Sequence, residues 1–187
     1  VRYEPVKGTT IRLSAGRGQR TANIFAENNS VFVSARQMSI ITSSAGKAYG
    51  LDPEVAWNKG ISIDQKFRLF NRSANFALDF FRNDFQQQVI VDLEDARQVK
   101  FYNLDGKSYS NSFQAEMNLE PVKKLEVRLA YRFFDVKSTY GGQLLQKPFT
   151  ARHRAFTNLA YEAGGWKFDY TFNINGSKRI TNTSANP

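Results

Sequence analysis

The sequence of 187 residues contains no cysteine and a single histidine, His153. The missing thiols exclude disulfides, thiolate metal sites and cysteine nucleophiles from this stretch of chain. One imidazole cannot build a histidine-based metal cluster, and any catalytic triad would depend on that one side chain. We therefore predict no metal, no cofactor and no enzymatic activity, and we expect His153 to start a strand without a catalytic duty.

Long apolar runs are also missing. No segment approaches the ~20 apolar residues that a membrane-spanning helix needs. Hydrophobic residues make up 41% of the chain, and the mean hydropathy is −0.49. Because half of each strand in a transmembrane β-barrel is polar, a barrel wall escapes a hydropathy scan. The lack of an apolar helix therefore leaves a membrane protein possible.

The charge is unbalanced but not concentrated. Lysine and arginine number 26 against 17 acidic residues, which gives a net charge of +9 and a pI of about 9.8. The basic residues are spread along the whole chain, whereas a nucleic-acid-binding surface gathers them on one face. We predict no nucleic-acid partner. The N-terminus also lacks the pattern of a secretory signal, and we expect both ends to be cut from a longer protein.

Alternation of apolar and polar residues is the most informative feature present. In residues 124–133, one face carries Leu, Val, Leu, Tyr and Phe, and the other carries Lys, Glu, Arg, Ala and Arg. Residues 166–175 and 109–119 repeat this period of two, which is the period of a β-strand. A transmembrane strand needs about 9–11 such residues. Alternation alone does not say which face is outside.

The same alternation, with Gly, Pro and Asn clusters at the ends, predicts about seven strands. They cover residues 9–18, 57–68, 72–91, 107–119, 124–136, 152–162 and 166–178. Tight turns at 69–71, 120–123 and 163–165 alternate with long links at 19–56, 92–106 and 137–150. Outer-membrane barrels likewise have short turns at their periplasmic end and long loops at their extracellular end. The predicted fold is all-β, an antiparallel up-and-down sheet that forms part of a large transmembrane β-barrel.

The polar positions of these strands carry charges of both signs. On a solvated face each ion pair would contribute only about 0–1 kcal/mol. In a wide barrel the same groups line the lumen and meet water or a plug domain, and the planar forks of arginine suit carboxylates and backbone carbonyls. We favour the lumen. The residues predicted to face the lumen or a plug are Arg12, Glu116, Glu126, Arg128, Arg132, Arg154 and Asp169.

Several segments, in order along the chain, resemble those of TonB-dependent outer-membrane receptors. Residues 16–28 place small residues before an arginine-containing corner and an acidic residue, and residues 51–60 contain Leu-x-Pro-Glu followed by Asn and Gly. Residues 77–85 with 89–91 are similar to an aromatic strand of that family. Residues 101–111 and 144–148, followed by His153 and Arg154, resemble the Bacteroidetes-type receptors. Each motif is weak alone, but their succession is specific.

The resemblance implies a closed barrel of about 22 strands filled by an N-terminal plug. This chain would be a partial barrel from the C-terminal half, residues 1–187, without the plug, the TonB box or the final strand. The whole protein would lie in the bacterial outer membrane, in contact with its lipid. It would bind a scarce nutrient such as a siderophore, cobalamin or glycan, and energy transmitted through TonB would move the plug and admit the ligand.

Ligand contacts are expected in the loops at 17–49, 92–105 and 138–147, since loop tips commonly carry function. The side chains proposed for testing are Arg36, Phe101, Tyr102 and Tyr140. The acidic group Asp92, Glu94 and Asp95 could instead bind calcium, although a solvated charged loop is favoured.

Two other interpretations remain open. One is a soluble β-sandwich or small-barrel binding module whose apolar face points inward. The other is an outer-membrane enzyme, which the single histidine disfavours. If the barrel is correct, the isolated piece has two open edges and an uncovered lipid face, and we expect it to self-associate in water.

Overall fold

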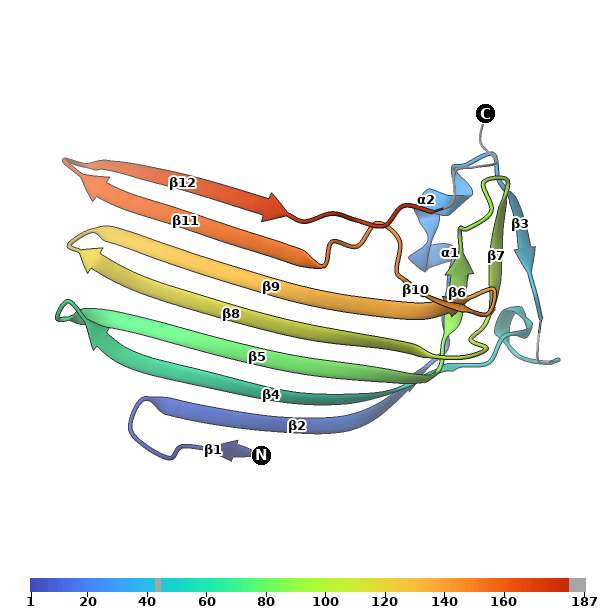
Figure 1. Cartoon of the computed structure of the whole chain (residues 1–187), viewed down its shortest axis with the longest axis horizontal. Helices are drawn as coiled ribbons and strands as arrows, with labels where there is room; N and C mark the ends of the chain where they lie inside the picture. The colour runs from blue at the N-terminus through green and yellow to red at the C-terminus, as the bar shows by residue number, and fades with distance from the viewer. Residues whose placement is uncertain (43–44, 182–187) are drawn as a thin grey trace.

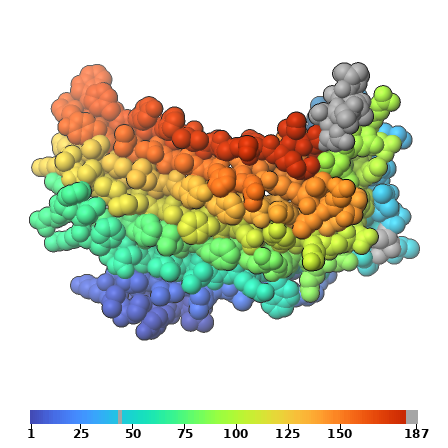
Figure 2. Space-filling model, viewed as in Figure 1, coloured from blue at the N-terminus to red at the C-terminus, as the bar shows by residue number. Residues whose placement is uncertain are grey.

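The structure, a computed structural model, describes residues 1–42 and 45–181. Its main feature is a 9-stranded sheet in which neighbouring strands are antiparallel. The long strands lie side by side as one curved layer (Figures 1 and 2), and tight hairpin turns join them in pairs at one end (Figure 1). In spatial order the strands are β1 (Arg2–Tyr3), β2 (Thr9–Arg20), β4 (Glu54–Leu69), β5 (Arg72–Gln87), β8 (Ser108–Val122), β9 (Leu125–Tyr140), β11 (His153–Ala163) and β12 (Trp166–Asn175), with β10 (Gln143–Gln146) pairing with β9.

A smaller unit lies at the opposite end of the long strands (Figure 1). It has a 3-stranded sheet in the order β3-β7-β6, in which β3 and β7 are parallel, together with short helices. We call this unit the cap. Its elements are α1 (Ile24–Glu27), α2 (Asn29–Phe32), β3 (Gln37–Ile40), η1 (Ala48–Gly50), β6 (Val89–Asp92) and β7 (Gln98–Asn103).

The predicted all-β, mainly antiparallel fold is confirmed, and each of the predicted strands corresponds to one of the long strands. The boundary at 72–91 differs, because β5 ends at Gln87 and β6 joins the cap. The backbone N–H of Val89 donates to the buried carboxylate of Glu54 at 3.1 Å instead of continuing the ladder of the large sheet. Part of the link at 17–49 is helical, since the Asn23 side chain caps α1 by accepting from the Ala26 N–H.

The hairpin turns have the backbone geometry that tight antiparallel connections need. Phe70 and Asn71 have φ of 52° and 59°, and Gly164 and Gly165 have φ of 54° and 84°. Two successive residues with positive φ form a type I′ turn, whose twist matches that of the flanking strands. These turns hold the long strands in register from one end of the sheet.

The register places most of the large apolar side chains of the long strands on one surface, which we call the apolar face; Phe81, Phe134 and Phe156 are exceptions on the other surface. One of its rows runs across the sheet through Ile11, Ile63, Leu78, Ala115, Tyr131, Ala155 and Ile174. Leu129 and Phe168 lie on the same face and remain 40% and 57% exposed. No second layer covers this face within residues 1–42 and 45–181, because the small sheet lies at the strand ends. A β-sandwich is therefore excluded for this part of the chain.

The buried core is in the cap, not beneath the large sheet. It consists of Ile24, Leu51, Val89, Val99 and Phe101, which are all less than a tenth exposed. The cap therefore holds itself together by apolar burial, whereas the large sheet depends on its hydrogen-bond ladders and on whatever covers its apolar face.

Gly60 shows how closely side chains pack on the other surface, the polar face. A Cβ added to Gly60 would lie 2.3 Å from Cδ1 of the Phe81 ring, which belongs to the neighbouring strand. Gly60→Ala is expected to displace that ring and cost about 1–3 kcal/mol of folding stability. Denaturant unfolding of the full-length protein measures this. Gly16→Ala is the matched control, since nothing lies within 4 Å of its added Cβ; equal effects of the two variants would contradict the packing described.

Candidate ligand-binding face and its cap

The residues predicted to face the lumen share the polar face. Successive register partners form a row through Arg12, Ser62, Asp79, Gln114, Arg132, Arg154 and Asn175. Glu116, Glu126, Arg128 and Asp169 lie on the same face in adjacent rows. Asp79 was not among the predicted residues. Continuing the apolar–polar alternation of β4 through the hairpin turn at Phe70 would have placed Asp79 on the polar face.

Three of these residues, Arg128, Arg132 and Arg154, form a cationic cluster that we call the arginine patch. Arg132 and Arg154 are direct cross-strand partners on β9 and β11. Like charges in that position repel each other and destabilise a sheet. Among residues 1–42 and 45–181, the carboxylate that pairs with the patch is Glu116, whose Oε1 accepts from Arg128 Nε at 3.0 Å. The patch therefore carries more positive than negative charge.

The other two arginines are held by neutral groups. Arg154 Nε donates to Asn175 Oδ1 at 3.0 Å, and the Arg132 guanidinium lies 5.3 Å from the centre of the Phe134 ring. The Nε of Arg132 is buried and has no hydrogen-bond partner among the described residues. These contacts fix the orientation of both guanidinium groups and leave donors available. The arrangement suits an incoming carboxylate or other anion.

The patch surrounds an open recess of about 350 Å³ in the polar face. A recess of this size is at the lower end of the range for small-molecule sites. Its lining includes Gln114, Glu116, Phe156 and Asn173 as well as the three arginines. The recess therefore offers amide, aromatic and cationic contacts to one bound group.

The cap covers the end of the polar face that lies away from the hairpin turns (Figure 1). Ser108, Ser110, Val136 and Ser138 lie on this face near the cap end of β8 and β9, and all are buried. The Ser108 hydroxyl bonds to Gln88 Oε1, which lies just before β6. At the same end, Asp135 and Thr139 on the other side of β9 are also buried, beside Arg152 and Lys107. The cap thus narrows the space in front of the polar face at the end with the long connections.

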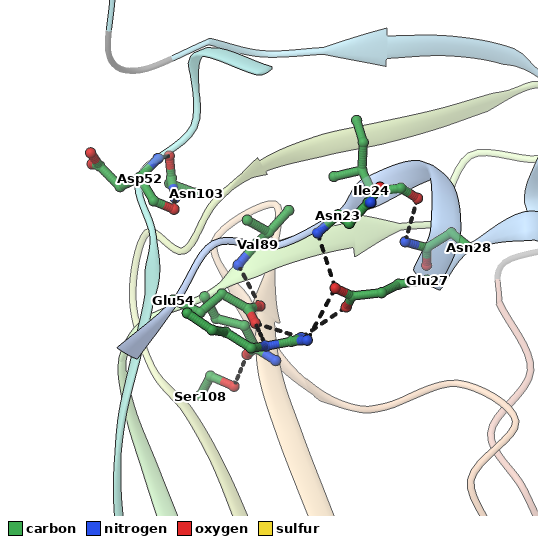
Figure 3. Close-up of polar contacts among 11 residues, drawn as sticks. Asn23, Ile24, Glu27, Asn28, Asp52, Glu54, Val89, Asn103 and Ser108 are labelled. Atoms are coloured by element: carbon green, nitrogen blue, oxygen red, sulfur yellow. Dashed lines mark hydrogen bonds and ion pairs between the residues drawn. The ribbon is translucent and has the colours of Figure 1, made fainter. Parts of the chain in front are cut away.

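Glu54 joins the cap to the large sheet (Figure 3). The residue is 9% exposed, and its carboxylate accepts from the Val89 N–H at 3.1 Å and from Arg20 Nε at 2.7 Å. Arg20 also makes a two-point contact with Glu27 of α1, at 3.0 and 2.8 Å. The contact with Glu27 raises the pKa of Arg20. The Asn23 backbone N–H, followed by Arg20, lowers the pKa of Glu27.

A second connection fastens the segment after β12 to the cap. Arg179 NH1 donates to Glu94 Oε2 at 3.0 Å, and its guanidinium lies 5.7 Å from the centre of the Tyr140 ring. The contact with Glu94 raises the pKa of Arg179, and burial raises the pKa of the Tyr140 hydroxyl. Arg179 therefore links three chain segments that are distant in sequence.

The acidic residues considered for calcium are engaged elsewhere. Asp92 accepts from the Tyr102 hydroxyl at 2.8 Å, Asp95 accepts from the Arg97 N–H, and Glu94 pairs with Arg179. Burial and the contact with Asp92 raise the pKa of Tyr102. Across residues 1–42 and 45–181, no three His, Cys, Asp or Glu side chains gather as a metal-ion cluster. The geometry gives no support to the calcium alternative.

The four residues proposed from loops do not all lie at loop tips. Phe101 and Tyr102 belong to β7 and Tyr140 ends β9, so their expected positions in loops were wrong. Phe101 is 1% exposed and Tyr140 is 6% exposed, because the cap core and the Arg179 contact cover them. Arg36 lies before β3 and is partly exposed. Whether any of them contacts a ligand stays a prediction, and Phe101 could do so only if the cap opened.

Comparisons with known proteins agree with this architecture. The family model described as TonB dependent receptor-like, beta-barrel matches residues 1–187. Among solved structures, the siderophore receptor PiuA from Acinetobacter baumannii matches with a TM-score of 0.54 and 19% sequence identity. The match covers 86% of this chain and 22% of that receptor, and at this identity it concerns the fold alone. No protein in the curated set matches.

The described residues contain no helix with the length and apolar character needed to cross a membrane. The family is one of receptors and transporters, not of enzymes. Its model covers every residue from 1 to 187, and the long antiparallel strands supply the fold it describes. The chain belongs to the TonB-dependent receptor β-barrel family.

Proposed function

We propose that the protein containing this chain is an outer-membrane receptor for TonB-dependent uptake of a scarce nutrient. The observation that carries the proposal is the uncovered apolar face of the long strands, in a chain matched throughout by the receptor family. In a bilayer that face contacts acyl chains, and the polar face encloses a lumen. The described strands then form a partial barrel, completed by strands outside this chain at the β1 and β12 edges.

In this proposal the polar face meets the receptor's own plug domain. The arginine patch suits carboxylates or backbone carbonyls of a plug, and also an anionic ligand on its way through the lumen. Energy transmitted through TonB moves the plug, and no covalent bond in the ligand is broken. The parts that contact TonB would lie in the N-terminal region of the whole protein.

The nutrient is proposed by class: a siderophore, cobalamin or a glycan. The matched structure is named as a siderophore receptor, and the excess positive charge of the arginine patch favours an anionic ligand among these. On the cap side, Arg36, Tyr102 and Tyr140 remain the proposed ligand contacts. The subgroup is proposed to be Bacteroidetes-type, on the resemblance of residues 101–111 and 144–148.

A growth experiment tests the proposal directly. Deletion of the gene in its host should impair growth when iron is chelated, when cobalamin is limiting or when a glycan is the carbon source. Restoration by the plasmid-borne gene should require functional TonB. The full-length protein should also fractionate with the outer membrane, need detergent and change its gel mobility on heating. A protein that stays monomeric in plain buffer and shows none of these properties would contradict the proposal.

The arginine patch gives a residue-level prediction. Arg132→Gln with Arg154→Gln should lower nutrient uptake at least tenfold, because two oriented cationic donors are lost and charge-assisted hydrogen bonds contribute about 1.5–3 kcal/mol each. Folding stability should stay the same or rise slightly, since a like-charge pair is removed. Lys66→Gln, on the same face of β4 but outside the recess, is the matched control. Unchanged uptake by the double variant would show that the arginine patch does not contribute to transport.

The isolated chain gives a second check on the exposed surfaces. The segment 1–187 alone is expected to self-associate in water, because its sheet edges and apolar face are uncovered. Light scattering at rising concentration should show dimers or larger species. A clean monomer at high concentration would contradict the proposed exposure to lipid.

A further inference from the structure

Ala130 is the smallest side chain that lines the recess at the arginine patch. Its cross-strand partners are Glu116 on β8 and Phe156 on β11, and its nearest same-face neighbours along β9 are Arg128 and Arg132. All four long side chains also line the recess. Because a methyl group is bordered by longer side chains in both directions of the sheet, one compact chemical group can lie on Ala130 and contact several of them at once.

The charges at the recess suit a single carboxylate. Arg128 is already paired with Glu116, whose Oε1 lies 2.9 Å from Arg128 NH2. Arg132 and Arg154 are direct cross-strand partners, and within residues 1–42 and 45–181 neither has a carboxylate of its own. A carboxylate between them accepts hydrogen bonds from both guanidinium groups and offsets their repulsion. A ligand with several carboxylates would bring more negative charge than this pair of arginines offsets.

Two side-chain amides at the recess have unused hydrogen-bonding groups. Gln114 is the cross-strand partner of Arg132, and Asn173 is the partner of Phe156. In the described part of the chain, neither amide makes a side-chain hydrogen bond. An amide both donates and accepts, which matches the donor and the acceptor of a hydroxyl group. The Phe156 ring adds an apolar surface for the C–H groups of a sugar ring. The neutral part of the recess therefore suits a hydroxylated ring.

A second, larger recess of about 640 Å³ adjoins the first at Arg128 and extends toward the hairpin turns. Asn118 of β8 and Asn158 of β11 lie on either side of Arg128 and line it. Their NH2 groups donate to Glu116 Oε1 at 3.0 Å and to Asp169 Oδ1 at 2.9 Å. Their amide oxygens accept no hydrogen bond from residues 1–42 or 45–181, so they are left for hydroxyl donors. The second recess therefore offers room and acceptors for a neighbouring neutral sugar.

We propose that the arginine patch binds an acidic sugar of a glycan, with the sugar carboxylate between Arg132 and Arg154 and its hydroxyl groups on Gln114 and Asn173. The next sugar of the glycan, a neutral one, occupies the second recess. This inference rests on the proposed function, because it concerns a ligand in the lumen, and it selects the glycan among the three proposed nutrients. A polycarboxylate such as citrate matches the arginines but leaves the amides and the second recess unused.

Isothermal titration calorimetry of the full-length receptor in detergent tests the inference with three probes. Cellobiouronate is an acidic disaccharide, cellobiose is the same disaccharide without the carboxylate, and citrate carries carboxylates without a sugar ring. The dissociation constant of cellobiouronate should be lower than those of cellobiose and citrate by about tenfold or more, because only the acidic disaccharide meets both the arginines and the amides.

Two double variants separate the contributions of the amides and the arginines. Gln114→Leu with Asn173→Leu should weaken cellobiouronate binding about tenfold and leave citrate binding unchanged, because the arginines remain. Arg132→Gln with Arg154→Gln should reduce the affinity for cellobiouronate to that for cellobiose. Thr10→Val removes one hydroxyl group from the polar face of β2, outside both recesses, and should behave as the wild type.

Three results would overturn the inference: no binding of cellobiouronate, equal affinities for cellobiouronate and cellobiose, or citrate bound as tightly as the acidic disaccharide. Detergent dependence and heat-dependent gel mobility of the same samples test the proposed function separately. A receptor that has both properties and gives any of these results lacks only the sugar site. A protein that has neither property contradicts the proposed function itself.

Discussion

Leu129→Arg is expected to cost the full-length receptor about 2–4 kcal/mol of stability in a bilayer. Leu129 lies on the apolar face of β9, between Met117 of β8 and Thr157 of β11, and it is 40% exposed. It is two rows from the apolar row of Ile61, Phe80, Phe113 and Phe133, toward the hairpin turns, so an arginine there would be surrounded by acyl chains. Denaturant unfolding in phosphatidylcholine vesicles measures the loss.

The neighbouring residue supplies a matched control for this substitution. Ala130 has its side chain on the polar face, opposite Glu116 of β8 and Phe156 of β11. Arginine at that position stays in water, and attraction to Glu116 opposes repulsion from Arg128 and Arg132, so Ala130→Arg should change stability by about 1 kcal/mol or less. A larger loss for Ala130→Arg than for Leu129→Arg would mean that the two faces are assigned in the wrong sense.

Glu54→Ala is expected to release the cap from the large sheet at a cost of about 2–3 kcal/mol. The substitution removes the acceptor for the buried Val89 N–H and one carboxylate partner of Arg20. An unsatisfied buried donor carries the full penalty of its desolvation. The effect should be concentrated in α1 and β6, because the long strands keep their ladder hydrogen bonds.

Hydrogen exchange of the full-length receptor measures how far Glu54→Ala releases the cap from the large sheet. Protection of the Val89 amide should fall about 30- to 140-fold, since 1.4 kcal/mol corresponds to a factor of ten in local opening. Glu54→Gln should retain part of the protection by keeping one oxygen acceptor. Glu162→Ala is the control, because Glu162 is exposed and lies 3.7 Å from Lys167 at the other rim. Unchanged exchange in α1 and β6 would show that Glu54 does not fasten the cap.

The long strands and their two faces could be predicted from the sequence because a period of two is a local property. Alternation in residues 124–133 fixes the faces of Leu129 and Arg132 without knowledge of their neighbours. Glycines and asparagines at the hairpin turns mark the strand ends, and the turns then fix the register of adjacent strands. The cross-strand pairing of Arg132 with Arg154 follows only when β9 and β11 are brought together, across a long connection.

The cap could not be predicted, because its structure depends on contacts between distant segments. Val99 and Phe101 pack against Ile24 and Leu51, and β3 pairs in parallel with β7 across more than fifty intervening residues. The short apolar pieces in residues 31–33 and 40–41 do not distinguish helix from strand by themselves. Aromatic residues in an expected loop suggest exposed ligand contacts, but Phe101 is buried by tertiary packing.

The proposed membrane location and the proposed lumen both depend on the outward orientation of the apolar face. Single-cysteine labelling of the full-length receptor in vesicles measures it most directly, and this segment adds no cysteine of its own. A fluorophore attached after Val127→Cys, Leu129→Cys or Phe168→Cys should be quenched by brominated acyl chains. One attached after Arg128→Cys or Ala130→Cys should not be. Quenching at both sets, or only at the second, would contradict the account.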